Sequence, residues 1–182
     1  MNGPVGDPAT TPEIAPAIDP DGRMAAITVL GIGNPIMGDD GVGLCLLAAL
    51  QSIRTDPGIE YVDGGTGGME LLPVVQDSTR LLILDAVDGT EPGAVRQVSG
   101  DQIPRLLQAK LSPHQVGLLD VFAAARLLGK EPELVEAIGI VPESVELRLG
   151  LTARVEAAVP VAVALAADVL DQWLTDSALN RE

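Results

Sequence analysis

Short runs of aliphatic and β-branched residues alternate along this chain with longer segments whose apolar residues recur at helical spacing. The runs predict strands at 26–32, 59–63, 80–86 and 137–141, with an edge strand at 93–98. The segments between them predict helices at 41–53, 68–75, 102–108 and 113–128, and a last helix that ends near Thr175. Strands that are apolar throughout and alternate with helices are typical of parallel sheets covered on both faces. We therefore expect a three-layer α/β fold with a mostly parallel sheet of about five strands.

The last predicted helix has two opposed stripes of side chains. The apolar stripe consists of Ala166, Val169, Leu170 and Trp173, and the polar stripe of Asp168, Asp171, Gln172 and Thr175. Such a pattern is typical of a surface helix docked on a sheet. An interior proline removes a hydrogen bond and clashes with the preceding turn, so we expect Pro160 to kink or to start this helix.

The chain has 182 residues, of which 47% are apolar, enough for one domain with a substantial core. Residues 1–24 carry a proline at every fourth position among small and acidic residues, a composition typical of a disordered tail. We expect a single α/β domain at 25–176 and a C-terminal tail at 177–182.

Charge and cysteine usage exclude several classes of protein. Eleven basic against 26 acidic residues give a net charge of −15, so we expect neither nucleic acid nor a membrane surface as a partner. The chain starts without a signal-peptide pattern, and its longest apolar run, 157–167, is too short to cross a bilayer. The single cysteine, Cys45, lies in an apolar run, where we expect a buried thiol. These features favour a cytoplasmic protein.

Three of the predicted strands end in residues that could take part in chemistry, namely Asn34, Asp63 and Asp85. The carboxyl ends of parallel strands lie along one edge of the sheet, where ligands bind. We therefore expect these side chains to be neighbours, with Asn34 a candidate for substrate binding. Asp85 is the most suggestive, because a carboxylate after four aliphatic residues of a central strand is expensive to bury without a partner. The alternative is that Asp63 or Asp85 only caps a turn or helix.

The first strand is followed by the glycine-rich stretch "GIGNPIMGDDGVG". A dinucleotide-binding turn would need glycine where Ile36 stands, and a phosphate-binding loop would need a lysine and a hydroxyl residue that are missing. What remains is a flexible turn that brings Asp39 and Asp40 to the start of a helix. Taken alone, the pair is explained by capping and by the helix dipole.

The only histidine of the chain, His114, follows Ser112 and Pro113, which with Gln115 form a capping box at the start of a helix. The positive end of the helix dipole disfavours the imidazolium, so a ring nitrogen stays available for a metal. Together with Asp40 and Asp85, His114 would surround a divalent ion and leave coordination positions open for substrate or water. The alternative is a structural histidine.

Five blocks occur in order along residues 26–173: "GIGNPIMGDDGVG", "DGGTGGMELL", "LILDA", "SPHQVGLLDVF" and "GIVPESVE". With them the chain resembles the nickel-iron hydrogenase maturation endopeptidases. The resemblance implies a twisted, mostly parallel sheet between helices. It also implies removal of a C-terminal extension from the hydrogenase large-subunit precursor once nickel is loaded. The proline-spaced tail is a departure, because members of this family generally lack it.

The resemblance also implies which residues act. Three residues bind a metal in a cleft of these proteins, and the matching positions are Asp40, Asp85 and His114; either Glu or Asp occurs at the first of them. The block "DGGTGG" is used in processing, which adds Asp63, Gly64, Gly65 and Thr66 as catalytic and substrate-binding candidates. Nickel carried by the precursor is the expected recognition element, with no organic cofactor. Zinc, cadmium or a similar ion could occupy the site in vitro.

Our mechanistic hypothesis is that the ion polarises a carbonyl or a water molecule while Asp63 or Asp40 acts as general base. A serine or cysteine triad is not expected, because the one histidine is committed and Cys45 lies in an apolar run. We expect a monomer. Three alternatives stay open: a non-catalytic nickel-dependent checkpoint or chaperone of the large subunit, a nucleotide-binding enzyme, and a peptidase of this fold that acts on another precursor.

Overall fold

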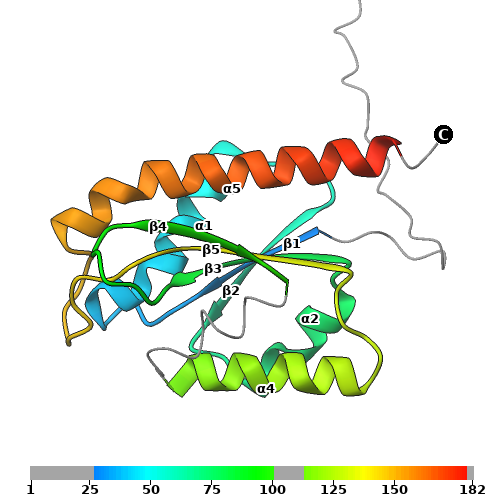
Figure 1. Ribbon diagram of the computed structural model, residues 1–182, viewed down its shortest axis with the longest axis horizontal. Helices are drawn as coiled ribbons and strands as arrows, with labels where there is room; N and C mark the ends of the chain where they lie inside the picture. Colours follow the sequence, from blue (N-terminus) through cyan, green and yellow to red (C-terminus); the bar gives the residue numbers. More distant parts are fainter. Residues whose placement is uncertain (1–26, 101–112, 180–182) are drawn as a thin grey trace, which may run out of the picture.

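The computed structural model describes residues 27–100 and 113–179, with side chains described for 27–100 and 117–176. The tail expected at 1–24 and the helix expected at 102–108 lie outside these residues. The described chain forms a five-stranded sheet with helices on both faces (Figure 1). This confirms the predicted three-layer α/β architecture.

The sheet has the strand order β2-β1-β3-β5-β4. Four strands run parallel, namely β1 (Ile27–Ile32), β2 (Ile59–Gly65), β3 (Arg80–Ala86) and β5 (Leu134–Ile140). The fifth, β4 (Val95–Ser99), pairs antiparallel with β5 and forms an edge, which confirms the edge strand predicted at 93–98. The run that ends in Asp85 is confirmed as a central strand.

Within the described residues, helices cover both faces of the sheet (Figure 1). α1 (Val42–Ile53) and α5 (Ala153–Leu179) lie on one face, and α2 (Leu72–Asp77) and α4 (Pro113–Leu127) on the other. Short 3-10 helices, η1 (Gly38–Gly41) and η2 (Met69–Leu71), precede α1 and α2. The strands alternate between the two cores: in β3, Leu82 and Leu84 pack towards α1 and α5, whereas Leu81 and Ile83 pack towards α2 and α4.

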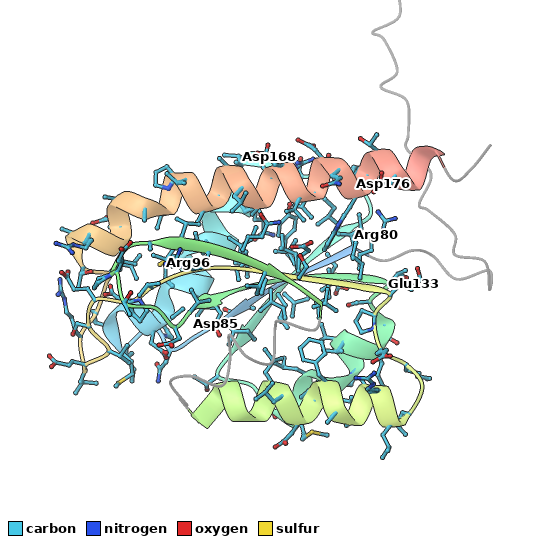
Figure 2. All side chains as sticks on the ribbon, viewed as in Figure 1. Arg80, Asp85, Arg96, Glu133, Asp168 and Asp176 are labelled. Carbon is cyan, nitrogen blue, oxygen red and sulfur yellow. The ribbon has the colours of Figure 1, made fainter. Side chains whose placement is uncertain are left out.

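The last helix confirms its predicted stripes and corrects its predicted bounds. The four apolar residues from Ala166 to Trp173 are buried, and the four polar ones are exposed. Asp168 lies on the outer side of α5 (Figure 2), and Asp176, near its end, is exposed as well. We expected Pro160 to kink or to start this helix; the helix begins at Ala153, so Pro160 does not start it, and the kink stays a prediction. Proline has no N–H group, so the carbonyl four residues before Pro160 lacks its helical donor. Because Pro160 is exposed, water can hydrogen-bond to that carbonyl instead. α5 also runs four residues past Thr175, into the segment expected as a tail.

The prediction that Cys45 is buried was wrong, because its side chain is exposed. The buried face of α1 consists of Val42, Gly43, Leu46, Leu47 and Leu50. Position 45 falls outside this stripe, although its immediate neighbours in sequence are apolar. None of the helices within the described residues is long and apolar enough to cross a membrane.

The order of the strands creates a switch point between β1 and β3. The chain leaves β1 through α1 on one face, forms β2, and then returns through α2 on the other face to place β3 on the opposite side of β1. Connections that diverge to opposite faces leave a crevice beyond the carboxyl ends of the two strands, the usual position of ligands in open α/β sheets.

Gly43 lets the first turn of α1 rest directly on the strands that border this crevice. A Cβ atom at Gly43 would lie 2.1 Å from the carbonyl oxygen of Ile32 and 2.3 Å from that of Leu84. Any side chain would push the helix away from both strands, because these contacts are to backbone. The close approach holds η1, with Asp39 and Asp40, at the carboxyl edge of the sheet.

Asp39 is a buried carboxylate that ties the connection between β5 and α5 to η1. Its Oδ2 accepts hydrogen bonds from the backbone N–H groups of Glu143 (2.9 Å) and Ser144 (3.0 Å) and from the hydroxyl of Thr152 (3.0 Å). Its Oδ1 accepts one from the N–H of Thr152 at 2.6 Å. Burial alone would raise the pKa of Asp39, but these hydrogen bonds outweigh it and hold the pKa below its ordinary value.

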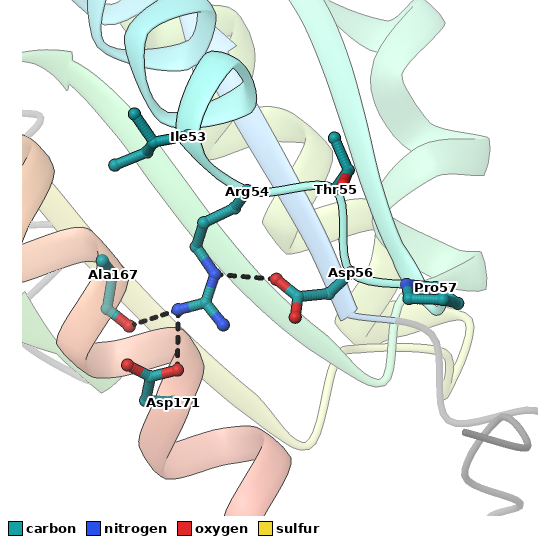
Figure 3. A pocket seen from close by; sticks show the side chains of 7 residues that line it. All are labelled: Ile53, Arg54, Thr55, Asp56, Pro57, Ala167 and Asp171. Atoms are coloured by element: carbon teal, nitrogen blue, oxygen red, sulfur yellow. Dashed lines mark hydrogen bonds and ion pairs between the residues drawn. The ribbon is translucent and has the colours of Figure 1, made fainter. Parts of the chain in front are cut away.

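Arg54 connects the other end of α1 to α5 (Figure 3). Its side chain is 13% exposed, and its guanidinium lies 2.7 Å from Oδ2 of Asp56 and 2.8 Å from Oδ1 of Asp171. It also donates to the carbonyl of Ala167 at 3.0 Å. The hydrogen bond to Asp56, and then that to Asp171, raise the pKa of Arg54. These residues line an open hollow of about 450 Å³ at the amino end of β2, away from the switch point.

Replacing Asp39 with Asn should lower the free energy of unfolding at neutral pH by about 2–4 kcal/mol, measured by urea denaturation. The amide retains one acceptor oxygen and turns a second atom into a donor, which leaves a buried N–H group unpaired. Because the pKa of Asp39 is lower in the folded chain, its contribution is present above the unfolded value and is lost as the pH falls through the folded one. The difference between the two proteins should therefore shrink below about pH 4. A constant difference would contradict a role for the charge.

Replacing Arg54 with Met should lower the free energy of unfolding by about 1–2 kcal/mol, because the carbonyl of Ala167 and the carboxylate of Asp56 lose a donor. Arg126→Met is the matched control. Arg126 lies 3.8 Å from Glu131 with both side chains more than half exposed, so its loss should change stability by less than about 0.5 kcal/mol. Equal effects in urea denaturation would show that Arg54 is no more than a surface ion pair.

Candidate functional site

The carboxyl edge of the sheet brings together the strand ends that carry the candidate polar residues. Gly31 of β1 is paired with Asp63 of β2 and with Leu84 of β3, the residue before Asp85. Asn34 and Asp40 follow β1 beyond the same edge. Figure 2 shows Asp85 and Arg80 at opposite ends of β3. The site residues predicted from strands β1, β2 and β3 thus lie at one end of the sheet.

Asp40 is held by the turn that leaves β1. Its side chain is 5% exposed, and Oδ2 accepts a hydrogen bond from the N–H of Asn34 at 3.1 Å. Gly33 has a φ of 137°, and a Cβ there would lie 2.0 Å from the carbonyl oxygen of Asp40, so only glycine lets the turn approach this closely. The two adjacent aspartates therefore divide their roles. Asp39 anchors a loop, and Asp40 stands at the crevice.

The side chain of Asn34 is used in its own turn. Its Oδ1 accepts a hydrogen bond from the N–H of Ile36 at 3.2 Å, while its backbone N–H donates to Asp40. Asn34 thus shapes the turn around the carboxylate, and a contact with substrate stays a prediction.

Asp85 is the second buried carboxylate at the switch point. Its side chain is 2% exposed, and Oδ1 accepts a hydrogen bond from the N–H of Ala86 at 2.7 Å. Side chains alternate along a strand, and Asp85 is in phase with Leu81 and Ile83, which pack towards α2 and α4. Asp85 therefore belongs to the face of the sheet on which α4 lies.

Asp63 is in a different setting from Asp85. It is exposed, and its Oδ1 accepts a hydrogen bond from the N–H of Gly65 at 3.0 Å. This hydrogen bond spans the irregularity in the pairing of β1 with β2, where Gly31 pairs with Asp63 and Ile32 with Gly65. Two strand spacings, about 10 Å, separate it from β3. Asp63 is also in phase with Ile59 and Tyr61, which pack towards α1 and α5. The structure places Asp63 on the same edge as Asp85 but does not bring the two carboxylates together.

The turn at 64–68 lies against the first half of α4. A Cβ atom at Gly117 would lie 3.0 Å from the Cα of Gly68, and one at Gly67 would lie 2.8 Å from the carbonyl oxygen of Gly64. His114 belongs to the first turn of α4, three residues before Gly117. The helix start is thereby placed beside the turn that follows β2. The side chain of His114 is outside the described residues.

Asp40 and Asp85 are two of the three predicted metal ligands, and both are buried at the switch point. Among the described side chains, no three His, Cys, Asp or Glu residues are grouped as a metal site would require. That description does not include the imidazole of His114. The switch point therefore holds the carboxylates of Asp40 and Asp85, and α4 begins on the face of the sheet to which Asp85 belongs.

Sequence reasoning missed the role of the connection between β5 and α5. Its residues Glu143, Ser144 and Thr152 fold back onto Asp39, so that the connection borders the edge beside Asp40. Two signals pointed to it: the pair of adjacent aspartates, which capping explained equally well, and the block "GIVPESVE", which contains Glu143 and Ser144 but gave no partner for them.

Comparisons with known proteins show which family this chain belongs to. The family model described as hydrogenase maturation protease, HycI, matches residues 45–169. The Hydrogenase 2 maturation protease of Escherichia coli (strain K12) is 39% identical over 140 residues, which are 75% of this chain and 85% of that protein. The hydrogenase expression/formation protein HoxM of Cupriavidus necator is 40% identical over 151 residues, covering 81% and 75% of the two chains.

Solved structures give the same result. The hydrogenase maturating endopeptidase HybD from E. coli is 37% identical, with a TM-score of 0.76 over 81% of this chain and 93% of that one. The [NiFe] hydrogenase maturation protease HybD from Thermococcus kodakarensis is 30% identical, with a TM-score of 0.64 over 79% and 98%. On its sequence and on its fold, this chain belongs to the hydrogenase maturation protease family.

Proposed function

We propose that this protein is an endopeptidase that removes the C-terminal extension of a nickel-iron hydrogenase large-subunit precursor after nickel insertion, as a monomer in the cytoplasm. Membership of the hydrogenase maturation protease family supports the processing of a hydrogenase precursor. The observation that carries the finer proposal is the pair of buried carboxylates, Asp40 and Asp85, at the switch point of the sheet.

The proposed role of these carboxylates is to contact the nickel that the precursor already holds. A buried carboxylate is stabilised by a cation, and imidazole and carboxylate groups both suit a divalent transition metal. Asp40 and Asp85 would provide two oxygens, and His114, at the start of the neighbouring α4, a nitrogen. The nickel is then part of the substrate, and these residues position the scissile peptide relative to the edge of the sheet.

A general base would activate water for the cleavage. Asp63 and Asp40 are the two candidates, and they differ in setting: Asp63 is exposed beside the turn 64–68, whereas Asp40 is buried under the Gly33–Asn34 turn. Cys45 is exposed, so burial does not exclude it as a nucleophile, but its position in the fold makes it a poor candidate. It lies on α1, whereas the only histidine lies on α4, across the sheet.

A processing assay by gel mobility tests the proposal directly. Purified protein should shorten a large-subunit precursor only when nickel is loaded. His114→Ala and Asp85→Asn should each lower the processing rate by at least about 100-fold. Replacing a residue that only supports a metal ligand already lowers metal affinity or activity by about 10–100-fold. Asp168→Asn, on the outer side of α5, is the matched control and should process normally. If His114→Ala cleaves as well as the wild type, the metal-contact role is wrong. If wild type binds the loaded precursor without cleaving it, the protein is a checkpoint.

The identity of the base is tested by Asp63→Asn. If Asp63 is the base, the rate at saturating precursor should fall by about 10²–10⁴-fold, because proton transfer is lost while substrate binding is kept. The Asn side chain keeps an oxygen that can accept the hydrogen bond from Gly65, so the variant should fold, which circular dichroism and urea denaturation check for the whole domain. A normal rate would remove Asp63 as the base and leave Asp40.

A further inference from the structure

Large apolar side chains are exposed next to the candidate site. Ile36 is 50% exposed, Val145 45%, Leu147 80% and Leu149 79%. We refer to these four residues as the edge patch. An isolated exposed leucine needs no explanation, but a group of large apolar residues on one surface is typical of an interaction site.

The backbone places two segments of the edge patch side by side, the one at Ile36 and the one at 147–149. The N–H of Arg148 donates to the carbonyl of Ile36 at 3.0 Å, and the N–H of Gly38 donates to the carbonyl of Arg148 at 2.9 Å. Met37 and Arg148 form a parallel bridge, so Leu147 lies opposite Ile36 and Leu149 opposite Gly38. Two segments far apart in the chain thus form one surface.

The edge patch is held in place before any partner binds. Asp39 accepts hydrogen bonds from Glu143 and Ser144 before the patch and from Thr152 after it, and the N–H of Asp39 donates to the carbonyl of Ser144 at 3.1 Å. A loop fixed at both ends loses little conformational freedom on binding. The structure thus presents Leu147 and Leu149 to solvent from an ordered loop.

The edge patch is continuous with the candidate site. Ile36 lies in the turn between Asn34 and Asp40, and Asp39, which anchors the loop, is the neighbour of Asp40. A protein bound to the edge patch would therefore reach the switch point of the sheet. A membrane surface is a poor partner, because a net charge of −15 repels anionic lipids.

We propose that the edge patch is the docking surface for the body of the hydrogenase large-subunit precursor, and that it binds an apolar area beside the segment to be cleaved. This inference rests on the proposed function, which supplies a protein substrate. Docking through the edge patch controls affinity for the precursor, whereas the carboxylates control cleavage.

The test compares two double variants of the full-length protein. Leu147→Ser with Leu149→Ser removes the two most exposed residues of the edge patch. Leu127→Ser with Leu128→Ser is the matched control, because these leucines are 89% and 58% exposed at the far end of α4. Urea denaturation should show that both variants fold. Processing rates at several concentrations of nickel-loaded precursor give KM and kcat, and biolayer interferometry gives Kd.

For the edge-patch variant, KM and Kd should rise by about tenfold or more with kcat retained, and the control should match the wild type. Unchanged KM and Kd, or an equal loss in the control, would overturn the proposal. A wild-type dimer that the edge-patch variant dissociates, seen by sedimentation, would overturn it in favour of self-association. If wild type binds the precursor but never cleaves it, the proposed protease function fails, and the Kd values alone decide whether the edge patch docks the precursor.

Discussion

The closeness of α1 to the sheet is the constraint on which the candidate site depends. With Gly43 against the carbonyl oxygens of Ile32 and Leu84, the helix begins on top of β1 and β3 rather than beside them. The 3-10 turn before it is thereby confined to the switch point. Asp39 and Asp40 lie in that turn. The backbone contact of Gly43 with the sheet therefore determines the position of both carboxylates.

The alternation of side chains across the sheet then places the polar residues on different faces. Asp85 belongs to the face of α4, on whose first turn His114 lies, and Asp63 to the phase that packs towards α1. The proposed mechanism needs different surroundings for the residues that contact the metal of the substrate and for the residue that activates water. A crevice between two strands, with connections leaving to opposite faces, provides both within one edge.

Much of this was predictable from the sequence, and the exceptions have physical causes. The apolar runs of β1 and β3 are buried on both faces, so they mark strands without ambiguity. Cys45 was misjudged because its neighbours Leu44 and Leu46 suggested burial, whereas helical geometry turns position 45 away from the core. The difference between Asp39 and Asp40 could not be predicted, because it depends on a loop more than a hundred residues later in the chain. His114 was placed on a helix start by its capping pattern, and α4 begins at Pro113.

The hydrogen bonds of Asp39 also affect how readily the connection between β5 and α5 opens to solvent. Loop amides commonly exchange with solvent as fast as local fluctuations expose them. The amides of Glu143, Ser144 and Thr152 are instead bonded to a carboxylate in the core, so they open only when the turn before α1 leaves the sheet. The loop therefore belongs to the same cooperative unit as the central strands. It unfolds with the domain rather than ahead of it.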